Sequence, residues 1–381
     1  MLALIMAGAR ASVLPSSYGT DTLVGTPLVP ASAPAVGSTY RALVAARVGE
    51  SFRDVARIVE VPVPELGADE VLVRVAYAGV NGGCETFRAR GEHAFAPNRE
   101  ADGFALGAEG VGVVAALGDG VEGFAQGDAV CFVGGGFAEY AKVKAQTLWK
   151  VPRPTPEMAA LRISALTACA MMEITGKVAA GEKVLVTAAA GGAGHFAVQF
   201  AKLAGCTVIG TCGSADKARA LCKLGCDHII NHRTKDVGEA LRRIAPGGVD
   251  VAFEGVGGAL LRTVLENLKE DGRLLQVGYI SEYPHNPERD AQSASHELQA
   301  GELFWKSQTV HRGEQTIYGN AWPRDFGAIA GCKQRVLDLH TSGALVALVD
   351  EKRTFDGLES VVDAVEYMLS GEAVGKVVVR M

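Results

Sequence analysis

The hydrophobic pattern of the chain changes near residue 152. From Tyr40 to Pro152, short apolar runs such as EVLVRVAYAGVN and DAVCFV are separated by turn residues at nearly regular intervals. This spacing predicts a small, partly closed domain made mainly of β-strands. Residues 157–176 then carry apolar side chains at helical spacing and end at Gly176, which predicts a helix leading out of that domain.

From Lys183 onward, strand and helix patterns alternate. Each predicted strand is a continuous Val/Ile/Leu run, and a helical pattern follows most of them; the strands read VLVTA, TVIGT, HIIN, VDVAFE and RLLQVG. This alternation predicts a parallel sheet with helices on both faces. SQTVHRGE reads as one more strand, and the last segment as a helix followed by a strand. The predicted fold class is therefore α/β, with a parallel-sheet domain and a mainly β domain.

Composition narrows the possible functions. Of the 381 residues, 48% are hydrophobic and 21% charged, and the formal net charge is −6. No Lys/Arg-rich run is present to neutralise a phosphate backbone, so nucleic acid is not an expected partner. No apolar stretch reaches the roughly 18 uninterrupted residues of a spanning helix, so we expect no membrane insertion. The composition is typical of a well-packed enzyme, for which the expected partner is a small-molecule substrate.

Residues 1–38 read as a disordered leader, rich in Ser, Thr, Pro and Ala. They contain one acid, Asp21, and one base, Arg10. Two interpretations stay open. A solvated extension predicts a cytoplasmic protein, whereas a transit peptide, which is poor in acids, predicts a plastid or mitochondrial one.

The strongest chemical motif lies between strand VLVT and helix HFAVQFAKLA. A dinucleotide pyrophosphate needs backbone N–H groups, no Cβ in the way, and the positive end of a helix behind it. The loop has the small residues that meet these needs, and the following βα unit distinguishes it from an ordinary tight turn. The predicted binding residues are Ala188, Gly191, Gly192, Ala193 and Gly194.

The second strand of this unit indicates which dinucleotide binds. An NAD site has an acid about 20 residues on, to accept the ribose 2′-OH, but here the strand is followed by Gly213-Ser214-Ala215-Asp216-Lys217. Ser214 at the helix start and Lys217 one turn in suit a 2′-phosphate instead. We therefore predict NADPH as the cofactor. The alternative is that Ser214 only caps the helix and Lys217 only faces solvent.

From Tyr40 to Met381 the chain resembles the zinc-independent medium-chain dehydrogenases/reductases of the quinone oxidoreductase group, which include the prostaglandin reductases. The resemblance rests on an ordered set of stretches: GVN (79–81), GAEGVGVVAALGDGV (107–121), GFAEY (136–140), KVLVTAAAGGAGHFAVQFAK (183–202), VIGTCGSADK (208–217), VGYISEY (277–283) and GLESVVDAVEYMLSGEAVGKVVV (357–379).

The resemblance implies a Rossmann domain over residues 164–312. It also implies a GroES-like catalytic domain formed by residues 39–163 and 313–381, with the active site in the cleft between the two domains. The implied activity is NADPH-dependent reduction of quinones, or of the C=C bond of α,β-unsaturated ketones and aldehydes. A catalytically idle NADPH-binding protein, with a sensing or structural role, is the alternative.

No metal site is predicted. Zinc-dependent relatives have Gly-His-Glu where this chain has Gly107-Ala108-Glu109, so an imidazole ligand is absent. The lobe of four closely spaced cysteines that those relatives carry is absent as well. Without a Lewis acid, alcohol oxidation is the less favoured chemistry.

Two residues are candidates near the reacting carbonyl, where an enolate charge develops. Tyr283 matches the ISxY element that in prostaglandin reductases lies against the nicotinamide ribose; its phenol would donate to the enolate or orient a ribose hydroxyl. Asn81 matches a cleft asparagine that would hold nicotinamide or substrate. The plain alternatives are a turn aromatic for Tyr283 and a turn asparagine for Asn81.

The chain also departs from the family pattern. Cys84 stands where many relatives have Asp, and Phe87 where they often have Tyr. His232 replaces a Tyr that lies near the 2′-phosphate in relatives, and we expect His232 to contribute to cofactor binding. His195 is interpreted as a helix N-terminal residue and not as a base. The polar segment 284–304 is a hypothetical substrate lid, and the strand SQTVHRG is expected to pair across a two-fold axis in a homodimer.

Overall fold

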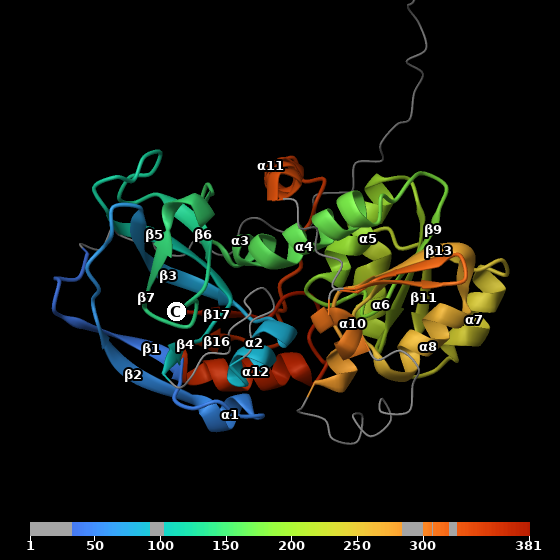
Figure 1. The fold of residues 1–381 in the computed structure, drawn as a ribbon, viewed down its shortest axis with the longest axis horizontal. Helices are drawn as coiled ribbons and strands as arrows, with labels where there is room; N and C mark the ends of the chain where they lie inside the picture. The colour runs from blue at the N-terminus through green and yellow to red at the C-terminus, as the bar shows by residue number, and fades with distance from the viewer. Residues whose placement is uncertain (1–32, 92–102, 284–299, 307, 320–325) are drawn as a thin grey trace, which may run out of the picture.

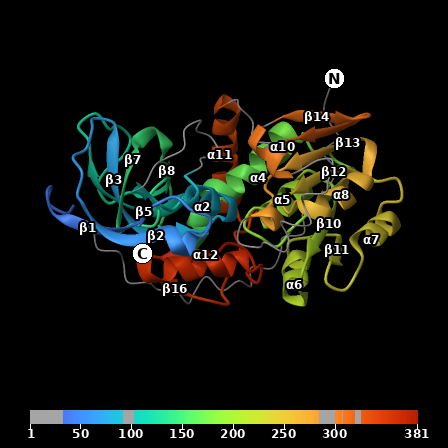
Figure 2. The same cartoon turned by 60° about the horizontal axis from the view of Figure 1, so that its bottom comes forward.

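The protein consists of two lobes joined by a long helical segment (Figure 1). The computed structural model describes residues 33–91, 103–283, 300–306, 308–319 and 326–381. The first lobe is rich in β-strands and contains the C-terminus, while the second is a sheet covered by helices (Figures 1 and 2).

Within the described residues, the first lobe contains two sheets. One has the order β2-β1-β4, and the other has the order β16-β17-β3-β5-β6-β8, with β7 paired to β3. Their bounds are β1 Thr39–Ala45, β2 Ala56–Pro62, β3 Glu70–Gly79, β4 Phe104–Ala105, β5 Glu109–Leu117, β6 Ala129–Val133, β7 Tyr140–Lys144, β8 Trp149–Lys150, β16 Phe355–Asp356 and β17 Val378–Arg380.

Both parts of the chain build this lobe. The last strand, β17, pairs antiparallel with β3, so that Val378 lies opposite Gly79. The core beneath it joins residues of both parts, among them Leu43, Phe137, Val365 and Val379. Short helices cover the sheets: α1 Phe52–Val55, α2 Gly82–Ala89, η1 Ala145–Thr147, η5 Leu358–Ser360 and α12 Val361–Leu369.

The second lobe is a sheet of the order β11-β10-β9-β12-β13-β15-β14 in the part of the chain that is described. Its first six strands are parallel and follow the Rossmann order. Its strands are β9 Lys183–Val186, β10 Thr207–Cys212, β11 His228–Asn231, β12 Val249–Glu254, β13 Leu268–Gln276, β14 Thr309–Arg312 and β15 Gln315–Tyr318.

The segment SQTVHRGE contains the expected strand, β14, but the chain then turns back into a second strand, β15, that was not expected. Strand β14 pairs antiparallel with β15, and Gly313 adopts a positive φ of 61° in the turn between them. The Rossmann domain was expected to end at residue 312. Strand β15 follows that boundary and still pairs parallel with β13, so the sheet of this domain extends past residue 312. The hairpin leaves β14 as the edge strand of the sheet.

Helices lie on both faces of this sheet (Figure 1). Side chains cap two of them at the N-terminus: Ser214 accepts from the Lys217 amide and Asp236 from the Glu239 amide. The helices of this lobe are α5 Gly194–Leu203, α6 Ala215–Lys223, α7 Val237–Ile244, α8 Gly258–Glu266, η4 Ile280–Glu282 and α10 Ala300–Lys306. Helix α11 Phe326–Thr341 packs instead against the helical segment that joins the lobes (Figure 1).

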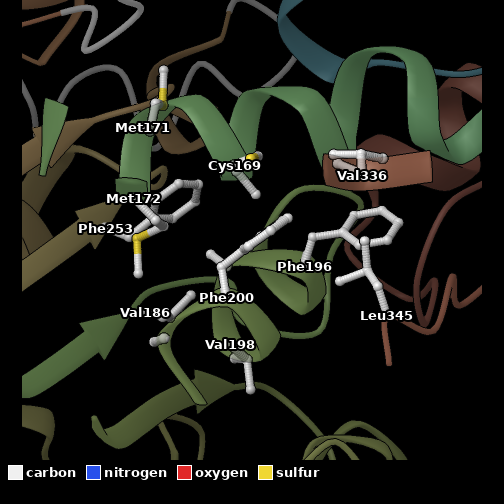
Figure 3. Close-up of a cluster of buried hydrophobic side chains, with 14 of the residues drawn as sticks. Cys169, Met171, Met172, Val186, Phe196, Val198, Phe200, Phe253, Val336 and Leu345 are labelled. Atoms are coloured by element: carbon white, nitrogen blue, oxygen red, sulfur yellow. The ribbon is translucent and has the colours of Figure 1, made fainter. Parts of the chain in front are cut away.

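A long helical segment crosses between the lobes. It comprises α3 Pro156–Ala160, η2 Leu161–Ala165, α4 Leu166–Cys169 and η3 Ala170–Thr175, as the apolar pattern predicts. The side chain of Phe200 in α5 points toward Cys169 of this segment, and that of Phe196 lies beside Val336 and Leu345 (Figure 3). Among the described residues, this is the one helix long and apolar enough to cross a membrane; 67% of its most apolar window is buried inside the protein.

Candidate functional site

The glycine-rich loop after β9 has the shape of a phosphate cradle. Ala188 adopts a positive φ of 45°. A Cβ on Gly194 would lie 2.4 Å from the Ala188 carbonyl oxygen, so only glycine fits there. No side chain caps α5, whose N-cap residue is Ala193. The His195 and Phe196 amides donate to the Gly191 and Ala193 carbonyls, so among the first amides of α5 that of Gly194 is left to a ligand. An anion is the ligand that a helix N-terminus prefers.

His195 ties this loop to the end of the chain. The buried imidazole contacts the Gly191 carbonyl through Nδ1 at 2.9 Å, and Nε2 accepts from the Leu348 amide at 3.1 Å. Burial lowers the pKa of His195 to about 4, so the ring is neutral at pH 7. Both ring nitrogens are engaged. This arrangement gives His195 a structural task and agrees with its interpretation as a helix N-terminal residue.

The structure gathers positive side chains beyond the carboxyl end of β10. A Cβ on Gly213 would lie 3.1 Å from His232 Nε2 and 3.4 Å from Arg233 Nε. Lys217 Nζ donates to the Gly371 carbonyl at 2.6 Å, which links α6 to the first lobe. Burial lowers the pKa of Lys217, and Lys352 adds to this effect. Ser214 caps α6 at the same end of the strand.

Tyr283 lies at the seam between the lobes. Its ring packs edge-on against Phe87 and Tyr279, at centroid distances of 5.5 and 5.0 Å. Its hydroxyl oxygen lies 2.8 Å from where a Cβ on Gly83 would stand, which explains the glycine there. Burial raises the pKa of Tyr283 far above its ordinary value, so the phenol keeps its proton and remains a donor.

Asn81 belongs to a buried network. Its Nδ2 donates to Glu109 Oε1 at 2.8 Å and, at 3.4 Å, to the Gly79 carbonyl. Its Oδ1 accepts from Lys376 Nζ at 2.7 Å. Both amide protons are therefore engaged, and a lone pair of Oδ1 is what remains for a ligand. Asn81 can accept from a carboxamide N–H, but it cannot donate to an enolate in this arrangement.

Lys376 is at the centre of this network. Its ammonium lies 2.6 Å from Glu109 Oε1, and the two side chains are 2% and 0% exposed. Glu109 Oε2 also accepts from the Ile163 amide of the connecting helical segment at 2.8 Å. A Cβ on Gly79 would lie 2.7 Å from Glu109 Oε1, so a glycine is needed beside the ion pair. A buried pair of this kind costs desolvation, and removal of one partner alone leaves an uncompensated buried charge.

Glu254 ends β12 next to the nucleotide loop. It is fully buried and accepts from the Val256 amide at 2.8 Å and from Gln276 Nε2 at 2.6 Å. Thr187, which follows β9, donates to the same carboxyl group. Burial raises the pKa of Glu254. This carboxyl group fixes the loops at the carboxyl ends of the central strands, where α/β proteins bind their ligands.

Sequence reasoning missed the roles of Lys376, Ser164 and Glu254, and considered Glu109 only as part of a zinc motif. A signal existed for two of them. Glu254 is an acid at the end of a buried strand, and Lys376 is a cation inside the apolar run AVGKVVV. Ser164 gave no signal, because a serine in a small-residue helix is common. Only the packing of three separate segments brings Glu109, Ser164 and Lys376 together.

Among the described residues, no group of three or more His, Cys, Asp or Glu side chains is arranged to hold a metal ion. At the position of the Gly-His-Glu motif of the zinc-dependent relatives, Ala108 stands in place of the histidine, and the carboxylate of Glu109 is paired with Lys376. The proposed lid, residues 284–304, lies largely outside the described residues. Its last part, from Ala300, is helical and places Phe304 against Phe87.

Comparisons with known proteins agree with this geometry. Residues 67–153 match the family model described as alcohol dehydrogenase GroES-like domain, and residues 192–326 the one described as zinc-binding dehydrogenase. Prostaglandin reductase-3 of Mus musculus is 36% identical over 100% of this chain and 98% of its own length. A probable quinone oxidoreductase of Leishmania amazonensis is 35% identical over 90% of this chain and 98% of its own length.

A solved structure, that of mycobacterial Rv1454c complexed with NADPH, superposes with a TM-score of 0.72 at 25% identity. It covers 90% of this chain and 100% of its own. The fold and the site define a medium-chain dehydrogenase/reductase. Within that class, the chain belongs to the zinc-independent quinone oxidoreductase group. The predicted family and the predicted fold class are confirmed.

Proposed function

We propose that this protein is an NADPH-dependent reductase of quinones and of C=C bonds conjugated to a carbonyl. The observation that carries the proposal is the cradle at residues 188–194, which lies beside the Asn81 network: a Cβ on Gly192 would stand 3.4 Å from Lys376 Cδ, and Lys376 Nζ donates to Asn81 Oδ1. The full-length relatives are a prostaglandin reductase and a quinone oxidoreductase by name, which supports the same reaction class.

The chain's own residues fit a dinucleotide with a 2′-phosphate. The glycine cradle and the uncapped α5 suit the pyrophosphate, since a Cβ at Gly194 would close the space. Lys217, His232 and Arg233 would hold the 2′-phosphate through charge-assisted hydrogen bonds. When bound, NADPH supplies the hydride for the reduction. The cofactor in the solved structure of mycobacterial Rv1454c is NADPH as well.

The site residues would position the substrate and its charge. For transfer, the protein must hold the two reacting carbons about 3 to 3.5 Å apart. Tyr283, protonated and buried at the seam, would donate to the carbonyl oxygen, where enolate charge develops, or orient a ribose hydroxyl. Asn81 Oδ1 would accept from the carboxamide N–H and fix the face of the ring.

The finer substrate proposal is an enone lipid of the 15-oxoprostaglandin type. The aromatic side chains of Phe87, Tyr279 and Phe304, which cluster beside Tyr283, support an apolar substrate. The alternative, a catalytically idle NADPH-binding protein, has no support among these relatives, which are named as reductases or oxidoreductases.

The proposal is tested by mixing the purified protein with NADPH and a panel of a 15-oxoprostaglandin, an alkenal and a quinone. We expect consumption of NADPH, followed by its absorbance, together with the saturated product of the enones. NADH should be consumed far more slowly. Binding of NADPH without consumption of it by any member of the panel would contradict the proposal and favour the idle binder.

The variant K217M separates the two cofactors within the same assay. Loss of a charged hydrogen bond to the 2′-phosphate should raise the KM for NADPH by about 10-fold or more and leave that for NADH unchanged. Lys223, exposed on the same helix, gives the matched control K223M, for which no change is expected. An equal loss with both cofactors in K217M would place Lys217 outside the 2′-phosphate site.

A further inference from the structure

The hydroxyl of Ser164 is a buried polar group at the edge of the candidate site. Ser164 lies in η2 of the connecting segment and is 4% exposed. Its Oγ accepts a hydrogen bond from Lys376 Nζ at 3.2 Å. An ammonium group only donates, so this contact uses a lone pair of Ser164 and leaves its proton unused.

No acceptor for the Ser164 proton is found among the described residues. Within the described part of the chain, the hydroxyl makes one hydrogen bond, the one that it accepts from Lys376 Nζ. Lys376 cannot turn away, because its three donors are divided among Glu109, Asn81 and Ser164. The direction of the Ser164 proton is therefore set: it points away from the ammonium. A buried donor of this kind needs an acceptor, and a ligand can supply the one that the described residues do not.

The Ser164 hydroxyl lies beside the nucleotide loop. A Cβ on Gly192 would stand 3.4 Å from Ser164 Oγ and 3.4 Å from Lys376 Cδ. The loop is held there by two backbone contacts: the Gly375 amide donates to the Ala190 carbonyl at 2.7 Å, and Gly191 and Gly375 form a parallel bridge. A dinucleotide in this cradle would bring its oxygens next to Ser164.

We propose that Ser164 donates a hydrogen bond to an oxygen of the bound reduced dinucleotide and that Lys376, held by Glu109, is the positioning residue that sets its direction. The inference rests on the proposed function. It assigns a cofactor-binding task to the connecting segment and a reason for the buried ion pair. The acceptor is an oxygen of the pyrophosphate, the adjoining ribose or the carboxamide.

The first experiment measures NADPH binding by fluorescence titration of wild type and S164A. We expect the Kd of S164A to rise about 3- to 10-fold, the range for loss of one hydrogen bond. The matched control is S360A, which removes a helical serine hydroxyl that already donates to the Gly357 carbonyl. Its Kd should equal that of wild type.

A mutant cycle tests the role of Lys376. The variant K376M alone would leave Glu109 buried and unpaired and is expected to fold poorly, so K376M/E109Q removes both charges together. We expect it to weaken NADPH binding about as much as S164A does. Adding S164A to K376M/E109Q should not weaken NADPH binding further. Without Lys376 the Ser164 hydroxyl is no longer oriented, so its hydrogen bond to the dinucleotide is already lost. Circular dichroism of each variant verifies folding.

The outcomes separate this inference from the proposed function. If wild type fails to bind NADPH, the proposed function fails and the inference falls with it. If wild type binds and S164A keeps the wild-type Kd, or raises only the substrate KM, the inference alone is overturned. If the losses of NADPH affinity in S164A and in K376M/E109Q add fully in the combined variant, Lys376 does not orient Ser164 and that part of the proposal is wrong. Titration with 2′-phospho-ADP-ribose, which lacks nicotinamide, locates the acceptor. If S164A also binds this compound more weakly than wild type does, the acceptor is in the phosphate–ribose part. If the two proteins bind it equally, the acceptor is the carboxamide oxygen.

Discussion

At the scale of the residue, burial decides the chemical state of the groups around the cleft. His195 is neutral because its ring is buried and Nε2 accepts from a backbone amide. Glu85 is fully buried as well, and burial raises its pKa to about 7. Tyr283 keeps its proton for the same reason. One cause, desolvation of the charged form, acts in opposite directions on acids and bases.

The titration of His195 predicts a pH dependence of stability. An unfolded histidine titrates near pH 6.5, whereas burial lowers the pKa of His195 in the folded protein to about 4. In this window the unfolded state binds the proton and the folded state does not. His195 therefore makes its full contribution to the free energy of unfolding above about pH 6.5. This contribution decreases as the pH falls from about 6.5 toward about 4.

The variant H195Q checks this prediction, since glutamine also offers a donor and an acceptor. Chemical denaturation at pH 7 and pH 5 should show wild type losing about 2 kcal/mol more than H195Q. Glu85 contributes the opposite slope, because its folded pKa is raised, but it does so equally in both proteins. Identical pH profiles for the two would show that His195 does not titrate between folded and unfolded states.

At the scale of the element, the loop between β9 and α5 depends on close backbone approach. Gly194 packs against backbone atoms of Ala188 and Ala189, and a Cβ at this position would lie 2.4 Å and 2.9 Å from them. Gly192 faces only side-chain atoms, at 3.4 Å from where its Cβ would stand. Backbone cannot move aside as a side chain can, so the two glycines differ in what they tolerate.

The variants G194A and G192A form a matched pair for this difference. Without cofactor, G194A should lose about 1–3 kcal/mol of unfolding free energy, because overpacking forces the loop apart. G192A should lose less than about 1 kcal/mol, because its Cβ would make ordinary contacts. Thermal unfolding followed by circular dichroism measures both. Equal losses would show that the loop adjusts to a Cβ at Gly194.

At the scale of the whole molecule, the hairpin β14–β15 leaves one edge of the second sheet open among the described residues. An open edge presents unpaired backbone groups that another strand can join. We expect β14 of two chains to pair across a two-fold axis, which continues the sheet through a homodimer.

The homodimer prediction is checked by sedimentation of wild type and of the double variant T309K/H311K. Both residues lie on β14 and are exposed. Wild type should have twice the mass of one chain, whereas four lysines facing each other across the axis should shift the variant to monomer by charge repulsion. The control Q334K adds a charge to exposed α11 and should remain dimeric. A monomeric wild type would contradict the prediction.

The sequence by itself determined the fold class, the positions of most strands and helices, and the nucleotide loop. These features depend on local patterns: strand periodicity, helix caps such as Ser214, and small residues between a strand and a helix. The turn at Gly313 and the strand β15 after it escaped this reasoning, because the apolar pattern alone does not show where the chain reverses after the predicted strand SQTVHRGE.

Only the tertiary structure decided the buried network beneath the loop. Asn81, Glu109, Ser164 and Lys376 come from segments that are far apart in the chain, and none of these segments indicates which of the others it meets. These side chains come into contact only when β17 pairs with β3 and the connecting segment packs over the Glu109–Lys376 ion pair. Pairing energies of buried polar groups depend on distance and desolvation, and neither quantity is written in local sequence.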